Sequence, residues 1–190
     1  LDANLRVNMR VEIRRIQQEL GITTVYVSHD QEECFSISDQ VAIMNKGVIE
    51  QLDDPATIFK YPKTEFIARF IGFANFITFD ERSERDGEIL LRVGDVVFRA
   101  GHNPGTLQSN GKKCAMRPDD LRVTTEAAAG QGENRLPGRV KVSTFLGRSY
   151  QYVVETKLGD FTVNQEMESP YRNGENVYLH FPQDKMVLVD

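Results

Sequence analysis

Short strand-like runs recur from Phe73 to the end of the chain, and this rhythm constrains the fold more than any other feature. Turn signals such as Gly94-Asp95 and Asn173-Gly174 separate the runs about every ten residues. The runs, rich in β-branched and aromatic residues, are 77–79, 88–93, 95–99, 113–116, 121–124, 138–145, 149–156, 160–164, 176–181 and 186–189. Such a series predicts small all-β barrels.

The residues before Phe73 instead carry helix and strand signals in turn. A helix is predicted to end at Gly21, because apolar residues recur before it at helical spacing: Leu5, Met9, Ile13, Ile16 and Leu20. Residues 22–28 are a short apolar, β-branched run, which is typical of a strand buried in an open α/β sheet. Asp30 then caps a second helix, with Glu32 and Glu33 near its positive end.

The remaining signals complete an α/β segment. They predict, in order, a hairpin of 40–44 and 48–51 around Asn45-Lys46-Gly47, a helix from Asp54-Pro55 to Phe59, and a helix over 65–71 that Thr64 caps and Gly72 ends. Residues 125–135 have the composition of a flexible loop. We therefore predict an α/β domain segment over 1–74 and an all-β domain over 75–190.

Composition and charge exclude several classes of protein. Hydrophobic residues make up 40% of the 190 residues and charged residues 27%, the balance of a soluble globular protein. A net charge of −5 argues against nucleic-acid binding. No apolar run approaches the ~20 residues that cross a bilayer, and no signal-peptide pattern opens the sequence. Cys34 and Cys114 lie far apart without metal-type spacing, so we expect free thiols and a cytoplasmic protein.

His29 is the residue most open to a chemical role. It follows the predicted buried strand, and open α/β sheets place ligand sites at the carboxyl ends of their strands. An imidazole there suits a ligand with negative charge, such as a phosphate oxygen, although a lone strand-end histidine is more often structural. The sequence contains no Gly-x-x-x-x-Gly-Lys-Ser/Thr phosphate loop (Walker A) and no apolar strand ending in Asp-Glu (Walker B).

The order of motifs resembles the last third of an ABC-transporter ATPase followed by a regulatory domain. The motifs that carry the resemblance are Leu1-Asp2, the run Thr24–Glu33 with Ser28-His29-Asp30-Gln31 inside it, Asp39–Gly47 and Asp54–Pro62. Residues 66–76 resemble the junction at which importer ATPases pass into a C-terminal domain of the TOBE type, which has an OB-like barrel. Ala115–Leu121 resembles a motif of that domain.

The resemblance implies roles for single residues. His29 matches the switch histidine that contacts the γ-phosphate of ATP, and Asp2 matches the D-loop aspartate that couples two nucleotide sites. Arg117, Pro118 and Asp119 match the regulatory-domain motif. For Arg117, a salt bridge that joins barrel strands and a contact with a ligand or partner both remain open.

The resemblance also implies the function of a longer protein. That protein would bind ATP and Mg²⁺ as a homodimer and couple ATP hydrolysis to solute uptake. It would act through a transmembrane permease fed by a solute-binding protein, on the cytoplasmic face of the membrane. Without Walker motifs, this chain alone is expected to bind no cofactor and to be inactive. Residues 75–190 would regulate the dimer and hold it together.

A second function class stays open at this point. In that class, the barrel domain is a non-catalytic module that senses a small oxyanion or an inhibitory protein, although Lys112, Lys113 and Arg117 form only a loose basic cluster. The transported solute is also open, because ferric-iron, polyamine, sugar, sulfate and phosphonate importers share the architecture. The junction Gly72–Phe76 favours the ferric-iron or polyamine branch.

Overall fold

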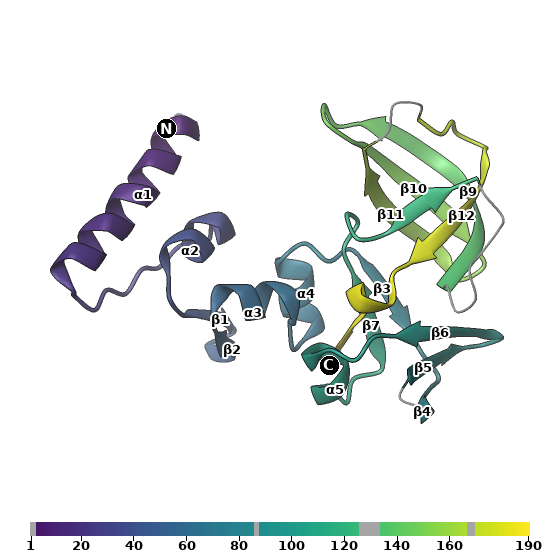
Figure 1. Ribbon diagram of the computed structural model, residues 1–190, viewed down its shortest axis with the longest axis horizontal. Coiled ribbons are helices and arrows are strands. Elements are labelled where there is room, and N and C mark those ends of the chain that lie inside the picture. The colour runs from purple at the N-terminus through teal and green to yellow at the C-terminus, as the bar shows by residue number, and fades with distance from the viewer. Residues whose placement is uncertain (1–2, 86–87, 126–133, 167–169) are drawn as a thin grey trace. The chain divides into compact units, whose positions relative to one another are not determined.

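The protein consists of two compact units, Leu1–Pro62 (unit 1) and Lys63–Asp190 (unit 2). A computed structural model describes residues 3–85, 88–125, 134–166 and 170–190 (Figure 1). The division falls before the predicted boundary at 74/75, because helix α4 (Glu65–Phe70) belongs to unit 2. The assignment of 1–74 to an ATPase segment remains a prediction.

Unit 1 combines short helices with one hairpin. Its elements are α1 (Ala3–Leu20), α2 (Gln31–Ile37), β1 (Val41–Asn45), β2 (Val48–Asp53) and α3 (Pro55–Lys60). The predicted helix ends are confirmed: Gly21 has a φ of 61° and donates its N–H to the Gln17 carbonyl at 3.0 Å. Asp30 and Asp54 cap α2 and α3 with their side chains, also as predicted.

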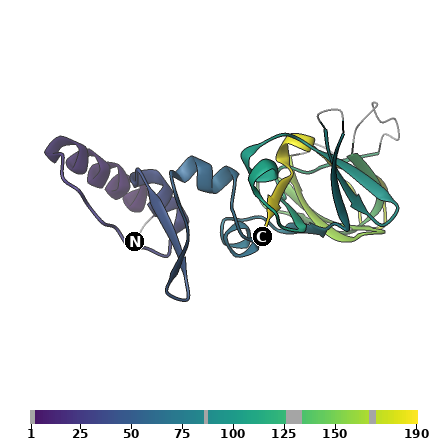
Figure 2. The same ribbon diagram turned by 90° about the horizontal axis from the view of Figure 1, so that it is seen from below.

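The β1–β2 hairpin is confirmed, and its turn is tighter than the sequence indicates. Lys46 and Gly47 have φ values of 48° and 81°, so both central residues lie in the left-handed region, as a two-residue type I′ turn requires. The sequence assigns this conformation to Gly47 alone. Figure 2 shows the hairpin as a narrow two-stranded ribbon.

The strand predicted over 22–28 is not formed. The segment is extended but pairs with no strand among the described residues, and Val25 and Val27 are 87% and 91% exposed. The apolar pattern predicts a strand covered on both faces in a parallel sheet, which requires neighbouring strands and helices. Residues 3–62 of unit 1 offer only the antiparallel β1–β2 pair, so this part of the predicted α/β fold is not seen.

Unit 1 leaves most of its apolar surface uncovered. The predicted apolar stripe of α1 faces solvent, with exposures from 37% at Ile13 to 64% at Leu20. One face of the hairpin is exposed too, through Met44, Ile49 and Leu52. Apolar patches of this kind mark surfaces that another segment or protein covers.

Unit 2 is mostly β, as predicted. Its elements are α4, β3 (Asn75–Thr78), β4 (Glu81–Arg85), β5 (Glu88–Val93), β6 (Val96–Ala100), α5 (Pro104–Gln108), β7 (Lys113–Met116), β8 (Arg122–Thr124), β9 (Asn134–Phe145), β10 (Tyr150–Thr156), β11 (Gly159–Gln165), β12 (Asn176–Phe181), the 3₁₀ helix η1 (Gln183–Lys185) and β13 (Val187–Val189). The described strands form antiparallel sheets in the orders β11-β10-β9-β12-β8, β13-β7-β3 and β4-β5-β6. The larger sheet curls strongly (Figure 1), and the OB-like character expected of this domain agrees with this architecture.

The sheets of unit 2 share one hydrophobic core. Phe181 of β12 lies at its centre, with ring centroids 5.2 Å from both Phe98 of β6 and Phe161 of β11, in edge-to-face contact. Cys114 is fully buried in the same core, and burial raises the pKa of its thiol to about 12. Both cysteines are free, as the sequence indicates.

Three side-chain amides join strands that do not otherwise pair. Asn75 of β3 accepts from the Thr162 N–H and donates to the Thr162 carbonyl, both at 2.8 Å. Asn134 of β9 bonds both main-chain groups of Arg99 at 2.7 Å. The Gln165 amide does the same with Val123, at 2.8 and 3.2 Å, and so connects the two outer strands of the larger sheet.

Each of these amides takes the place of a peptide group in a β-ladder. Asn75 and Asn134 are almost fully buried, at 3% and 5% exposure. Because buried main-chain groups need partners, the amides satisfy donors and acceptors where one sheet meets the next. Asn75 and Asn134 therefore fix how the sheets of unit 2 fit together, while Gln165 joins the two outer strands of one sheet.

Helix α4 is fastened to the barrel at its N-terminal end. The N–H of Glu65 bonds the Asp190 carbonyl at 2.9 Å, and the Asp190 N–H bonds the Lys63 carbonyl at 3.0 Å. The Glu65 carboxylate also binds Lys113 of β7. These contacts explain why α4 belongs to unit 2 although it precedes the first strand.

Candidate functional site

The predicted site residues fall into separate units. His29 lies in unit 1, and Arg117, Pro118 and Asp119 lie in unit 2. Asp2 lies outside the described residues, so its predicted D-loop role stays a prediction. We describe the two places in turn.

His29 stands at the bend that leads into α2, with its side chain exposed to solvent. Its two neighbours are held in place. Ser28 Oγ accepts the N–H of Asp30 at 3.0 Å, which closes a turn around His29. The same hydroxyl donates to Glu33 Oε2 at 2.8 Å, while Asp30 Oδ1 accepts the Glu33 N–H at 3.1 Å. The backbone is thus fixed while the imidazole stays free for a ligand.

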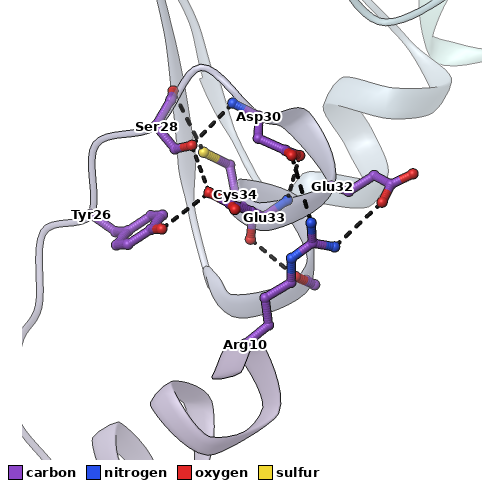
Figure 3. Close-up of polar contacts among 8 residues, drawn as sticks. Arg10, Tyr26, Ser28, Asp30, Glu32, Glu33 and Cys34 are labelled. Carbon is purple, nitrogen blue, oxygen red and sulfur yellow. Dashed lines mark hydrogen bonds and ion pairs between the residues drawn. The ribbon is translucent and has the colours of Figure 1, made fainter. Parts of the chain in front are cut away.

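A polar cluster surrounds this turn (Figure 3). The Tyr26 hydroxyl donates to Glu33 Oε2 at 3.1 Å, and this hydrogen bond raises the pKa of Tyr26. From α1, Arg10 reaches Asp30 Oδ2 at 3.6 Å and Glu32 Oε2 at 3.3 Å. Among the described residues, none forms a hydrogen bond or ion pair with the His29 imidazole itself. The cluster positions the histidine without using up its nitrogens.

Cys34 lies beside the same turn but is not an activated thiol. Its Sγ is 4.0 Å from the Ser28 carbonyl, and partial burial raises its pKa. A nucleophilic cysteine needs a lowered pKa. The structure therefore agrees with a packing role for this residue.

In unit 2, Arg117 connects the barrel to the segment that enters it. Its guanidinium donates to the Ile71 carbonyl at the end of α4 and lies 4.2 Å from the centroid of the Phe73 ring. Gly72, which lies between these two contacted residues, has a φ of 94°, and a Cβ at this position would lie 3.3 Å from Arg117 Nη1. Burial lowers the pKa of Arg117. These contacts, which fasten the segment that leaves α4, favour a structural role for Arg117.

Pro118 and Asp119 contact β11. The Pro118 carbonyl accepts the Asn164 N–H at 2.9 Å, and Asn164 Nδ2 donates to Asp119 Oδ2 at 3.3 Å. Asp119 also lines an open polar pocket of about 660 Å³, together with Arg122, Arg148, Ser149, Asn164, Gln165 and Glu166. Arg148 already binds Glu166 at 2.7 Å. The pocket therefore mixes paired charges and does not gather Lys112, Lys113 and Arg117.

Asp120→Asn is expected to stabilise the protein at neutral pH by less than about 1 kcal/mol, since this carboxyl is only half-buried. Burial raises the pKa of Asp120, and this outweighs the attraction of Lys185 and Arg117. Because the pKa of Asp120 is higher in the folded than in the unfolded protein, the wild-type protein loses stability as the pH rises from the unfolded pKa, about 4, through the folded pKa. Thermal unfolding should show equal stability of variant and wild type near pH 3 and a more stable variant at pH 7. A variant less stable at pH 7 would contradict this reading.

Two further properties bear on function. Within the described ranges, no helix is both long and apolar enough to cross a membrane. The same ranges contain no group of three or more His, Cys, Asp and Glu side chains placed to hold a metal ion.

Comparisons with known proteins relate the whole chain to import proteins. The chain is 38% identical over 192 residues to the Fe(3+) ions import ATP-binding protein FbpC of Agrobacterium fabrum, covering 100% of this chain and 52% of that protein. It is 36% identical over 194 residues to the spermidine/putrescine import ATP-binding protein PotA of Thermobifida fusca, covering 99% and 50%. The chain thus spans about half the length of the curated relatives it matches.

The comparisons also identify the type of domain formed by the C-terminal part of unit 2. A family model of the TOBE domain matches residues 114–189. Among solved structures, the cytoplasmic molybdate-binding protein ModG has a TM-score of 0.49 and 16% identity, over 61% of this chain and 95% of that one. Residues 114–189 therefore match the TOBE domain, and the homologues of the chain are ATP-binding proteins of ABC importers, to whose C-terminal region it corresponds.

Proposed function

We propose that this chain works as the C-terminal region of the ATP-binding subunit of an ABC importer, which couples ATP hydrolysis to solute uptake. The observation that carries the proposal is the end-to-end alignment with FbpC at 38% identity, in which 100% of this chain matches. The exposed His29, held in a fixed turn, is the feature of the structure that suits this activity.

In this proposal, His29 is the switch histidine. An imidazole fixed by its neighbours and open to solvent can hydrogen-bond a γ-phosphate oxygen and stabilise the charge that develops there during hydrolysis. Asp2, in the D-loop, would report the state of one nucleotide site to the other. The phosphate loop and the catalytic carboxylate would come from the part of the protein that precedes this chain in its relatives.

The uncovered apolar surfaces of unit 1 support this arrangement. The α1 stripe, Val25 and Val27, and the open hairpin face are the surfaces that a larger α/β domain would bury. ATP is the substrate of the proposed reaction. The described carboxylates do not converge on a metal position, so we assign no Mg²⁺ ligand to this chain, and Mg²⁺ would be held elsewhere in the complete site.

For the TOBE-containing unit, we propose regulation and dimerisation. The complete protein would form a homodimer through its ATPase and regulatory domains and bind transmembrane permease subunits at the cytoplasmic face of the membrane. A solute-binding protein would act indirectly, through the permease. Substrate choice would then depend on the permease and binding protein rather than on residues of this chain.

Ferric iron or a polyamine is the proposed solute class, since these are the solutes named for FbpC and PotA. The test is uptake into proteoliposomes that hold the longer protein with its permease and binding protein. We expect ATP-dependent accumulation of ferric iron or spermidine, with no uptake of sulfate or maltose. Uptake of sulfate or maltose alone would contradict the solute class, and solute uptake without ATP hydrolysis would contradict the function.

The sensing module is the less favoured candidate. The unit 2 pocket contains both acidic and basic side chains, and Arg148 is already paired with Glu166. An oxyanion site needs unpaired donors that converge on the ligand. Isothermal titration of the whole chain with molybdate, tungstate and sulfate separates the two functions. We expect no saturable binding, and saturable binding of one of these anions would support the sensing role.

A further inference from the structure

Arg10 connects helix α1 to the turn that holds His29. It lies on α1, while its partners Asp30 and Glu32 lie at the start of α2 (Figure 3). Its side chain is only 15% exposed, and its Nε is buried with no hydrogen-bond partner among the described residues. A largely buried cation with an unpaired N–H is unfavourable for folding, so its retention calls for an explanation.

The pair of Arg10 with Glu32 is the shorter one, but the two carboxylates differ in exposure. Glu32 is 86% exposed, so its pair with Arg10 contributes little. Asp30 is 31% exposed and has further contacts, because its side chain caps α2 and its N–H bonds Ser28. Arg10 therefore acts chiefly on the residue that directly follows His29.

We infer that Arg10 is a positioning residue, which fixes the His29 turn through Asp30 and so transmits the position of α1 to the histidine. The inference rests on the proposed role of His29 at an ATP site. The contacts form one continuous chain: Arg10 holds Asp30, Asp30 and Ser28 enclose His29, and Glu33 holds Ser28. A shift of α1 relative to α2 would therefore move the imidazole.

The alternative is that Arg10 only fastens α1 to α2, and Arg14 provides the comparison. One turn further along α1, Arg14 binds the carbonyl of Ile37, the last residue of α2, at 3.1 Å and Asp39, just after that helix, at 2.6 Å. Both arginines thus join the same helices, but only Arg10 contacts a neighbour of His29. If fastening were the whole role, the two residues would matter equally for ATP turnover.

The test measures ATP turnover by three separate variants of the longer protein, Arg10→Gln, Arg10→Lys and Arg14→Gln. The melting temperature of each variant is compared with that of the wild type to check that it is folded. We expect Arg10→Gln to lower kcat at least tenfold with KM for ATP within about twofold, because a misplaced group loses transition-state contacts more than ground-state binding. Arg10→Lys should recover part of kcat, since lysine can still pair with Asp30. Arg14→Gln should stay within about threefold of wild type.

A double variant separates the two explanations. If Arg10 acts through His29, adding Arg10→Gln to His29→Ala should cost no further turnover. Fully additive losses, or equal losses for Arg10→Gln and Arg14→Gln, would overturn the positioning role. If Arg10→Gln retains turnover while His29→Ala loses it, only this inference fails. If His29→Ala itself retains turnover, the proposed role of His29 fails as well.

Discussion

Asn134→Asp is expected to lower the free energy of unfolding of unit 2 by about 3–5 kcal/mol. In the wild type, Asn134 Nδ2 donates to the carbonyls of Arg99 and Phe181, at 2.7 and 3.1 Å. The substitution puts an oxygen where this donor stood, so a buried carboxylate would face two carbonyl oxygens. The shape of the side chain hardly changes, and the effect therefore isolates the hydrogen bonds.

Urea denaturation followed by circular dichroism measures this effect. Alkylation of Cys114 provides a second probe, because its thiol is buried in unit 2 with its pKa raised to about 12 and reacts only when the core opens. Asn110→Asp is the matched control, since Asn110 is exposed and the same chemical change there should stay within about 0.5 kcal/mol. An Asn134→Asp variant as stable as this control would show that the paired amides do not hold the sheets together.

The local elements of unit 2 are readable from the sequence, but the way they join is not. Residues 88–93, 113–116 and 176–181 are strands as predicted, because alternating apolar residues and turn signals specify them locally. The three amide connections pair residues such as Asn75 and Thr162, which lie far apart in the chain. Asparagine and glutamine also occur in ordinary turns, so nothing in the sequence distinguishes these amides.

The elements missed by sequence reasoning have physical causes. β4 reads Glu-Arg-Ser-Glu-Arg over 81–85, without the alternation that signals a strand, because it lies at a sheet edge and pairs only with β5. α5 is short, and its start is marked by the capping box of Asn103 and Thr106. The Asn103-Pro104 pair is also a turn signal, so the sequence alone does not indicate a helix there. The strand predicted over 22–28 is wrong for the opposite reason, because its pattern requires neighbouring strands that the described part of unit 1 does not contain.

The candidate site, like the fold, is only partly predictable from the sequence. His29 is found in the sequence because its type, its position after an apolar run and its acidic followers form a local pattern. Arg10 is not found, because its role depends on how α1 packs against α2, and one arginine on a charged helix face carries no signal of its own. The fixed turn around His29 likewise becomes evident only from the contacts of Ser28 and Glu33.

His29→Ala in the longer protein is expected to lower ATP turnover about 10²–10³-fold, the loss typical of removing one donor that stabilises transition-state charge. Nucleotide binding should change little, because the proposed contact strengthens as charge develops on the γ-phosphate. The fold should also persist, since the imidazole is exposed and forms no hydrogen bond or ion pair with the described residues. A melting temperature close to that of the wild type would verify this.

His102→Ala is the matched control for this substitution. His102 lies in unit 2, where its Nε2 is 3.6 Å from Glu84 Oε1, and the two side chains are 38% and 61% exposed. Its removal takes away one imidazole at the surface without touching the turn at α2. Turnover within about twofold of wild type would show that the loss in His29→Ala is specific to the site.

We propose that this chain supplies the histidine of an ATP site that the rest of a longer protein would complete. Steady-state ATP hydrolysis by the purified longer protein, compared between wild type, His29→Ala and His102→Ala at saturating ATP, tests it most directly. We expect the wild type and His102→Ala to turn over ATP alike, and His29→Ala to be nearly inactive although folded. A folded His29→Ala protein that hydrolyses ATP at the wild-type rate would contradict the account.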